Sequence, residues 1–304
     1  MDQRRGNACA GLWEGGVIDP FFITGPALIS FSGGRTSGYM LWRILQAHGG
    51  TLPDDVHVCF ANTGKEREET LRFVHECATR WNVRVNWLER AETIRGFSEL
   101  GFNSASRSGE PFSALIAKKG YLPNSVTRYC TVELKIRVMR DFARTMDWRR
   151  WDSVVGLRAD EPTRVASALA RNASGKEPFR AVTPLYHAGV TNREVRAFWG
   201  QQGFDLNLLP FEGNCDACFL KARPKLFEVE RTKPGTLDWW IEQETAEAGL
   251  RSATEAGSRF RAAETYADIR DAVRRSPDLF AGGLFDDDPD MDAECGLWCS
   301  GEAA

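Results

Sequence analysis

The residues from position 27 to 40 read A-L-I-S-F-S-G-G-R-T-S-G-Y-M. Ala27–Phe31 suits a buried strand, and apolar residues recur at helical spacing from Tyr39 to Leu45. The strand and the helix are joined by Ser32-Gly33-Gly34-Arg35-Thr36-Ser37. Such a turn directs backbone N–H groups and the positive end of a helix at one place, which suits a phosphate or another oxyanion. Taken alone, the stretch is equally compatible with a plain strand-to-helix turn.

Composition sets limits on the class of protein. The chain has 304 residues, 42% of them hydrophobic, and a formal net charge of −3. This length predicts one large α/β domain, or a domain with an added lobe. The net charge does not indicate nucleic-acid binding by the whole chain, although it is compatible with a local basic groove. No apolar run approaches the roughly 20 residues of a membrane span, and the first 25 residues lack the apolar core of a signal peptide. We expect a cytoplasmic protein that does not associate with a membrane.

Strands alternate with helices after the first turn. Residues 56–61 and 83–88 are typical of buried strands, residues 67–80 have helix spacing between them, and residues 151–156 suggest a further strand. This alternation predicts an α/β fold with a parallel twisted sheet and helices on both faces. Ligands on such sheets bind at the carboxyl ends of the strands. We therefore expect the Ser32 loop and the loop Asn62-Thr63-Gly64 to face one crevice.

The middle of the chain offers further candidates for that crevice. Residues 97–128 are irregular, and indicate either a lid over the crevice or a solvated excursion. A helix is expected from Arg128 toward Met146. Arg158 and Arg164 follow the strand at 151–156, where arginines could clamp an anion or form ordinary surface salt bridges.

The C-terminal part is expected to be mainly helical. Thr191 and Glu194 form a T-x-x-E capping box, and residues 222–275 look helical. We expect four parts in all: an N-terminal extension (1–26), a nucleotide-binding domain (27–220), a helical region (221–280) and an acidic, cysteine-containing tail (281–304).

Eight cysteines occur in the chain. In a cytosolic α/β protein they favour metal binding or catalysis over disulfides. Cys215 and Cys218 form a C-x-x-C sequence flanked by Gly and Asn, which is typical of a metal-binding or redox turn. Cys59 and Cys77 lie in apolar segments and are expected to be buried small hydrophobic residues.

Several of these segments together resemble the phosphoadenylylsulfate (PAPS) reductase family of the PP-loop, or adenine nucleotide alpha-hydrolase-like, superfamily. The resemblance covers residue 27 to the C-terminus in the family's order. It includes S-G-G-R-T-S, the N-T-G followed by T-L-x-F-V at 70–74, the G-x-R at 156–158, the T-P-L at 183–185, the C-x-x-C, and E-C-G-L at 294–297. The chain departs from the family pattern at Tyr129-Cys130, where iron–sulfur reductases have Cys-Cys, and at Trp298, which stands in place of a histidine.

The resemblance implies roles for individual residues. An adenine nucleotide, either ATP or a sulfonucleotide (PAPS or APS), would be bound by Ser32, Gly33, Gly34, Arg35, Thr36, Ser37, Asn62, Thr63, Gly64, Arg158 and Arg164. Cys295 corresponds to the reductase nucleophile, and Cys299 is a further candidate for catalysis. Cys130, Cys215 and Cys218 would hold a [4Fe–4S] cluster, or a structural zinc ion as the alternative.

The resemblance leaves three functions open. The first is sulfonucleotide reduction, in which Cys295 attacks sulfur and a thioredoxin-like protein or Cys299 releases sulfite. The second is an ATP-dependent, adenylating sulfurtransferase that modifies a nucleic acid or a small molecule through an iron–sulfur cluster. The third is a nucleotide-binding protein without catalysis.

Overall fold

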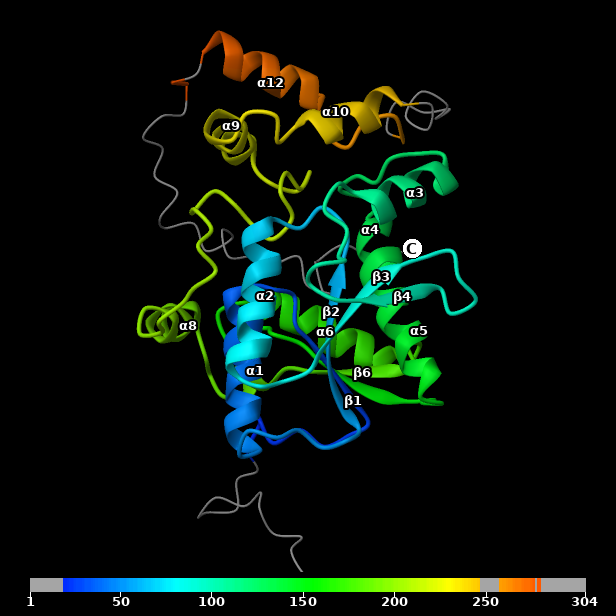
Figure 1. The fold of residues 1–304 in the computed structure, drawn as a ribbon, viewed down its shortest axis with the longest axis vertical. Helices are drawn as coiled ribbons and strands as arrows, with labels where there is room; N and C mark the ends of the chain where they lie inside the picture. Colours follow the sequence, from blue (N-terminus) through cyan, green and yellow to red (C-terminus); the bar gives the residue numbers. More distant parts are fainter. Residues whose placement is uncertain (1–18, 247–256, 277, 280–304) are drawn as a thin grey trace, which may run out of the picture.

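The structure is a computed structural model that describes residues 19–246, 257–276 and 278–279. A six-stranded sheet forms its centre, with strand order β4-β3-β2-β1-β5-β6 (Figure 1). All neighbouring strands are parallel except β3 and β4, which are antiparallel. The strands are β1 (Ala27–Ser30), β2 (Val56–Asn62), β3 (Val85–Arg90), β4 (Phe97–Leu100), β5 (Trp151–Val154) and β6 (Phe179–Val182).

One face of the sheet is covered by three helices, α1 (Arg35–Ala47), α2 (Glu68–Arg80) and α8 (Asn192–Trp199) (Figure 1). Their apolar residues pack against the strands in one hydrophobic cluster that includes Met40, Phe73 and Trp199. The cluster is dense enough that Gly38 lies directly against Trp199: a β-carbon at Gly38 would come within 2.8 Å of the indole ring. The start of α1 is therefore held firmly against α8.

The opposite face is covered by α5 (Arg137–Thr145) and α6 (Pro162–Ser174), which pack against Leu28, Leu88 and Val155. Helix α5 continues from a short helix α4 (Tyr129–Thr131) through a π-type turn η1 (Val132–Ile136). The expected arrangement, a mostly parallel sheet with helices on both faces, is confirmed. The expected helix from Arg128 is also present, with the π-type turn inside it.

A third hydrophobic cluster lies beyond the carboxyl ends of the strands and joins helices from both halves of the chain (Figure 1). It combines α3 (Glu110–Lys119) and α4 with α9 (Arg223–Thr232), α10 (Asp238–Thr245) and α12 (Tyr266–Arg275). A further short helix, α7 (Pro184–His187), follows β6. The expected helical C-terminal extension is thus confirmed.

One expectation from the sequence differs from the structure. Residues 97–128 were expected to be irregular, but they contain β4 and α3. β4 pairs at the edge of the sheet and has only Phe97 buried, and α3 begins after Gly109, whose φ is +85°. Cys59 and Cys77 are fully buried, as expected.

Among the described helices, none is sufficiently long and apolar to cross a membrane.

Candidate nucleotide crevice and cysteine turn

The loop between β1 and α1 is a close-packed turn that only glycine allows. Gly33 has a φ of +82°, and a β-carbon there would lie 2.6 Å from Cγ2 of Thr70 in α2. The hydroxyls of Ser32 and Ser37 are 2.9 Å apart, and Ser37 also donates to the carbonyl of Gly34 at 3.0 Å. The turn therefore places two hydroxyls at the positive end of the α1 dipole, an arrangement that suits an anionic group.

The segment after β5 lies against this turn. A β-carbon at Gly156 would be 3.3 Å from the Cα of Ser37, so a glycine allows the two backbones to approach closely. Arg158 is 2% exposed, and its guanidinium donates to the Thr36 hydroxyl and to Asp160, each at 2.9 Å. The sequence motifs around positions 32 and 156 are thus brought together, and Thr36 and Arg158, which join them, are 122 residues apart along the chain.

The loop after β2 is held by the side chain of Asn62. Its amide nitrogen donates to Glu89 at 2.5 Å and to the carbonyl of Ser106 at 2.9 Å, and its oxygen accepts the backbone N–H of Gly64 at 3.2 Å. Asn62 is fully buried. Its side chain therefore fixes the shape of the loop, and Thr63 and Gly64 follow it along the edge of the sheet where β1 also ends.

Each arginine that the sequence assigns to the nucleotide has a carboxylate partner. Arg35 forms two parallel hydrogen bonds of 2.8 Å with Asp205, and Arg164 pairs with Glu161. Arg158 pairs with Asp160. The charge of these guanidinium groups is therefore balanced in this state, and an anionic ligand would have to compete with carboxylates for them.

The C-x-x-C sequence forms a turn beside the same crevice. The thiol of Cys215 hydrogen-bonds with that of Cys218, and this bond, followed by burial, raises the pKa of Cys215 well above its ordinary value. Burial of the nearby Lys221 ammonium lowers the pKa of Lys221 to about 8, although the two cysteines act in the opposite direction. A metal ion at this turn would have to displace thiol protons, which links metal binding to pH.

Cys130 packs on the same hydrophobic cluster as Cys215. In the described ranges, however, no group of three or more His, Cys, Asp or Glu side chains is arranged to hold a metal ion. The three-donor set that a cluster or a zinc ion would require is not assembled among these residues, and we assign no reaction step to such a group. The assignment of Cys130, Cys215 and Cys218 as metal ligands stays a prediction. Cys295 and Cys299 lie outside the described residues.

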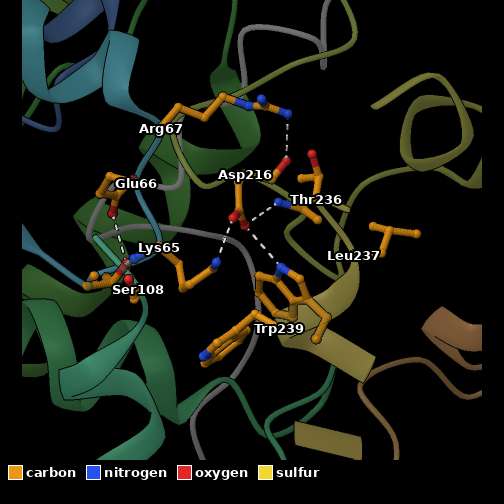
Figure 2. Close-up of polar contacts among 12 residues, drawn as sticks. Lys65, Glu66, Arg67, Ser108, Asp216, Thr236, Leu237 and Trp239 are labelled. Carbon is orange, nitrogen blue, oxygen red and sulfur yellow. Dashed lines mark hydrogen bonds and ion pairs between the residues drawn. The ribbon is translucent and has the colours of Figure 1, made fainter. Parts of the chain in front are cut away.

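The turn at Cys215 and Cys218, called the cysteine turn, contacts both the Ser32 loop and the Asn62 loop through residues that the sequence did not single out. These two loops are called the first and second nucleotide loops, after their expected ligand. Asn214 donates its amide to the carbonyl of Ser32 at 3.0 Å. Lys65 forms a 2.8 Å ion pair with Asp216, as Figure 2 shows. Asp205 is a further residue that sequence reasoning missed. Asn214 and Asp216 could have been noticed in the sequence only as polar residues next to C-x-x-C. Nothing in the sequence indicates that they bind Ser32 and Lys65.

The sequence was compared with models of known protein families. Residues 26–228 match the model of the phosphoadenosine phosphosulfate reductase domain. The chain belongs to the phosphoadenosine phosphosulfate reductase domain family. Within that match lie the Ser32 loop, the Asn62 loop, the segment from Gly156 and the cysteine turn. The family expected from the sequence is thereby confirmed.

Individual relatives include two phage proteins. The uncharacterized nin region protein ORF290 of Escherichia phage lambda is 30% identical over 215 residues, covering 66% of this chain and 67% of that protein. An uncharacterized 37.8 kDa protein from the gpa 5′ region of Escherichia phage 186 is 26% identical over 241 residues, covering 66% and 69%. Among solved structures, the U34-tRNA thiolase NcsA from Methanococcus maripaludis with its [4Fe–4S] cluster matches with a TM-score of 0.37 and 12% identity, covering 81% of this chain and 80% of that one.

Proposed function

We propose that this chain binds an adenine nucleotide at the carboxyl ends of β1, β2 and β5 and reduces a sulfonucleotide with Cys295 as nucleophile. The observation that carries the nucleotide part is the convergence of two other family segments on the Ser32 turn: Arg158 bonds to Thr36 and Gly156 lies against Ser37, while Asn214 bonds to Ser32. In open α/β sheets a ligand binds where strand order reverses, and here β2 and β5 lie on opposite sides of β1.

The phosphates or the sulfate group would lie at the Ser32 turn. There the serine hydroxyls donate to oxyanions, and the dipole of α1 favours their negative charge. Arg158 would hold the turn through Thr36 and supply positive charge from a site that is almost closed to solvent. Arg35 and Arg164 would reach the ligand by exchanging a carboxylate for a phosphate or sulfate oxygen. The two parallel hydrogen bonds of Arg35 fit a phosphate or sulfate as well as a carboxylate.

The chemical step would transfer the sulfonate group to a thiol. The Cys295 thiolate attacks sulfur, so that an S–S bond forms and the S–O bond to the nucleotide phosphate breaks; the nucleoside phosphate leaves with that electron pair. A second thiol, from a thioredoxin-like protein or from Cys299, then attacks the Cys295 sulfur, which forms a disulfide and releases sulfite. A dithiol reductant supplies the two electrons that restore the enzyme. The attacking thiol must be ionised, so its pKa of ordinarily about 8.5 has to fall in the crevice.

The test measures two products from two nucleotides. Purified protein is incubated with PAPS or APS and a dithiol reductant, and separately with ATP, and sulfite and pyrophosphate are quantified. We expect sulfite from a sulfonucleotide and no pyrophosphate from ATP. Cys295→Ser should abolish sulfite release while leaving the Kd of the nucleotide unchanged, because the substituted residue supplies only the nucleophile.

Two outcomes would overturn the reductase. Sulfite release that survives Cys295→Ser would rule out this nucleophile. Pyrophosphate release from ATP, without sulfite release from either sulfonucleotide, would instead indicate an adenylating sulfurtransferase, whose nucleic-acid or small-molecule acceptor would then be sought.

A further inference from the structure

The cysteine turn is joined to the second nucleotide loop by backbone as well as side-chain contacts. Glu66 and Cys215 form an isolated antiparallel bridge. On either side of it, the N–H of Arg67 donates to the carbonyl of Asn214 at 2.8 Å, and the N–H of Asp216 donates to the carbonyl of Lys65 at 3.0 Å. The residue just before Cys215 and the residue just after it are therefore both fixed to the loop that follows β2.

Asp216 lies at the centre of this junction. Its carboxylate accepts an ion pair from Lys65 at 2.8 Å, a hydrogen bond from the Trp240 indole at 3.0 Å and its neighbour Ala217's N–H at 2.6 Å. Its carbonyl accepts the guanidinium of Arg67 at 3.3 Å, and Figure 2 shows Lys65 and Arg67 converging on it. The Lys65 side chain is 8% exposed and its ammonium lies 5.0 Å from the centre of the Trp239 ring, so the ion pair is shielded from solvent.

Asn214 makes the corresponding contact with the first nucleotide loop. It is 8% exposed, and its amide donates to the carbonyl of Ser32, a residue of the turn itself. The cysteine turn thus shares one hydrogen bond with the Ser32 loop and several polar contacts with the loop after β2. A ligand that orders either loop must also reduce the freedom of the turn, because opening the turn breaks those same bonds.

We infer that Asn214 and Asp216 are positioning residues that couple nucleotide binding to the state of the Cys215–Cys218 pair. A nucleotide bound at the Ser32 and Asn62 loops holds the cysteine turn closed, and opening of the turn weakens nucleotide binding by the same factor, because the coupling is reciprocal. The inference rests on the proposed nucleotide binding and adds a regulated site to it. It requires neither catalysis nor a bound metal.

The test measures how fast each thiol is alkylated. Metal-free, reduced protein is treated with iodoacetamide, with and without PAPS or ATP at about twenty times the Kd measured by calorimetry, and each cysteine is followed by peptide mass spectrometry. Cys215 and Cys218 are half-buried, so opening of the turn exposes them further and speeds their alkylation. Cys59 and Cys77 are fully buried and report global unfolding. We expect the nucleotide to slow modification of Cys215 and Cys218 by at least ~5-fold, beyond any effect on Cys59 and Cys77.

Two variants remove the coupling by different routes. Asn214→Ala deletes the bond to Ser32, and Asp216→Asn removes the charge that pairs with Lys65. In each, we expect protection by the nucleotide to fall below ~2-fold, and the Kd of the nucleotide to rise by the factor of protection lost. Asn103→Ala and Asp271→Asn change the same residue types at exposed positions and should retain full protection.

The outcomes separate this inference from the proposed function. Calorimetric binding of a nucleotide with less than 2-fold protection in the wild-type protein would overturn the coupling alone, as would full protection in both variants. Failure of every nucleotide to bind would overturn both. The wild-type comparison decides whether the coupling exists, and where one variant does not fold, the other still tests the role of its residue.

Discussion

The ion pair between Arg67 and Glu212 offers the sharpest test of how the cysteine turn is held. The two side chains are 5% and 1% exposed, and their charged atoms are 2.9 Å apart. Glu212→Gln keeps the shape of the side chain and leaves the Arg67 cation without its carboxylate. Removal of one partner of a buried pair typically destabilises a protein by about 3–5 kcal/mol, because the remaining charge stays buried. In a chain of this size we expect the Tm to fall by roughly 6–15 °C.

The opposite substitution should be milder. Glu212 also lies 3.2 Å from the ammonium of Lys233 and accepts the N–H of Leu209 at 2.9 Å, so Arg67→Met leaves the carboxylate with a partner. We therefore expect Arg67→Met to reduce the free energy of unfolding less than Glu212→Gln. The double variant Arg67→Met/Glu212→Gln should be less destabilised than the sum of the single effects, since it removes both charges of the pair. Urea unfolding provides all the values. A loss below about 1 kcal/mol for Glu212→Gln would refute this reasoning.

Two further predictions concern the first nucleotide loop and the capping box. Gly33→Ala should destabilise the protein by about 2–4 kcal/mol and abolish nucleotide binding, because a β-carbon there combines a φ of +82° with a contact of 2.6 Å. Gly49 has a φ of +64° with open space around it, so Gly49→Ala should show only the backbone strain. Calorimetry should find the nucleotide Kd of Gly49→Ala unchanged. Hydrogen bonds from the Thr191 hydroxyl and N–H lower the pKa of Glu194 to about 2. The folded state therefore favours the ionised carboxylate. The stability advantage of wild type over Glu194→Gln should be full above pH 4.5, shrink as the pH falls, and vanish below about pH 2; thermal melts from pH 7 to 2 that show a constant gap would contradict this.

The central sheet could be read from the sequence because its strands are buried on both faces. Residues 27–31 and 56–61 form near-continuous apolar runs, and the structure has strands at Ala27–Ser30 and Val56–Asn62. The helix after Thr191 was equally clear, because its capping box is a local signal that the structure reproduces.

The edge strands could not be read in this way. β4 has the sequence F-S-E-L and is half exposed, and β6 has four residues, of which only Ala181 is buried. Such short segments lack both the length and the apolar run that distinguish a strand from a loop. Their pairing depends on contacts with β3 and β5, which lie elsewhere in the chain.

The sequence predicts the motif residues of the candidate site, but it does not predict the residues that bind them. Glycine-rich and cysteine-containing stretches carry their own pattern, so the Ser32 turn and the C-x-x-C turn were named from sequence. The residues that bind them were missed: Asp205 is paired with Arg35 across 170 residues, and Asn214 with Ser32 across 182. Asp205 has no local signal, and Asn214 is marked only by its place beside C-x-x-C; for both, the fold alone brings the residue to its partner.

The junction between the two nucleotide loops and the cysteine turn also determines the order in which the protein can be built. Arg67 and Asp216 are 149 residues apart, so their contact closes a very long loop and forms slowly. During synthesis from the N-terminus, β1, β2 and α2 emerge well before residue 216. The contacts between the nucleotide loops and the cysteine turn can form only after the turn has left the ribosome. The sheet can therefore be present on a nascent chain while the nucleotide crevice is still incomplete. A ligand that binds the finished crevice would then favour completed chains over partial ones.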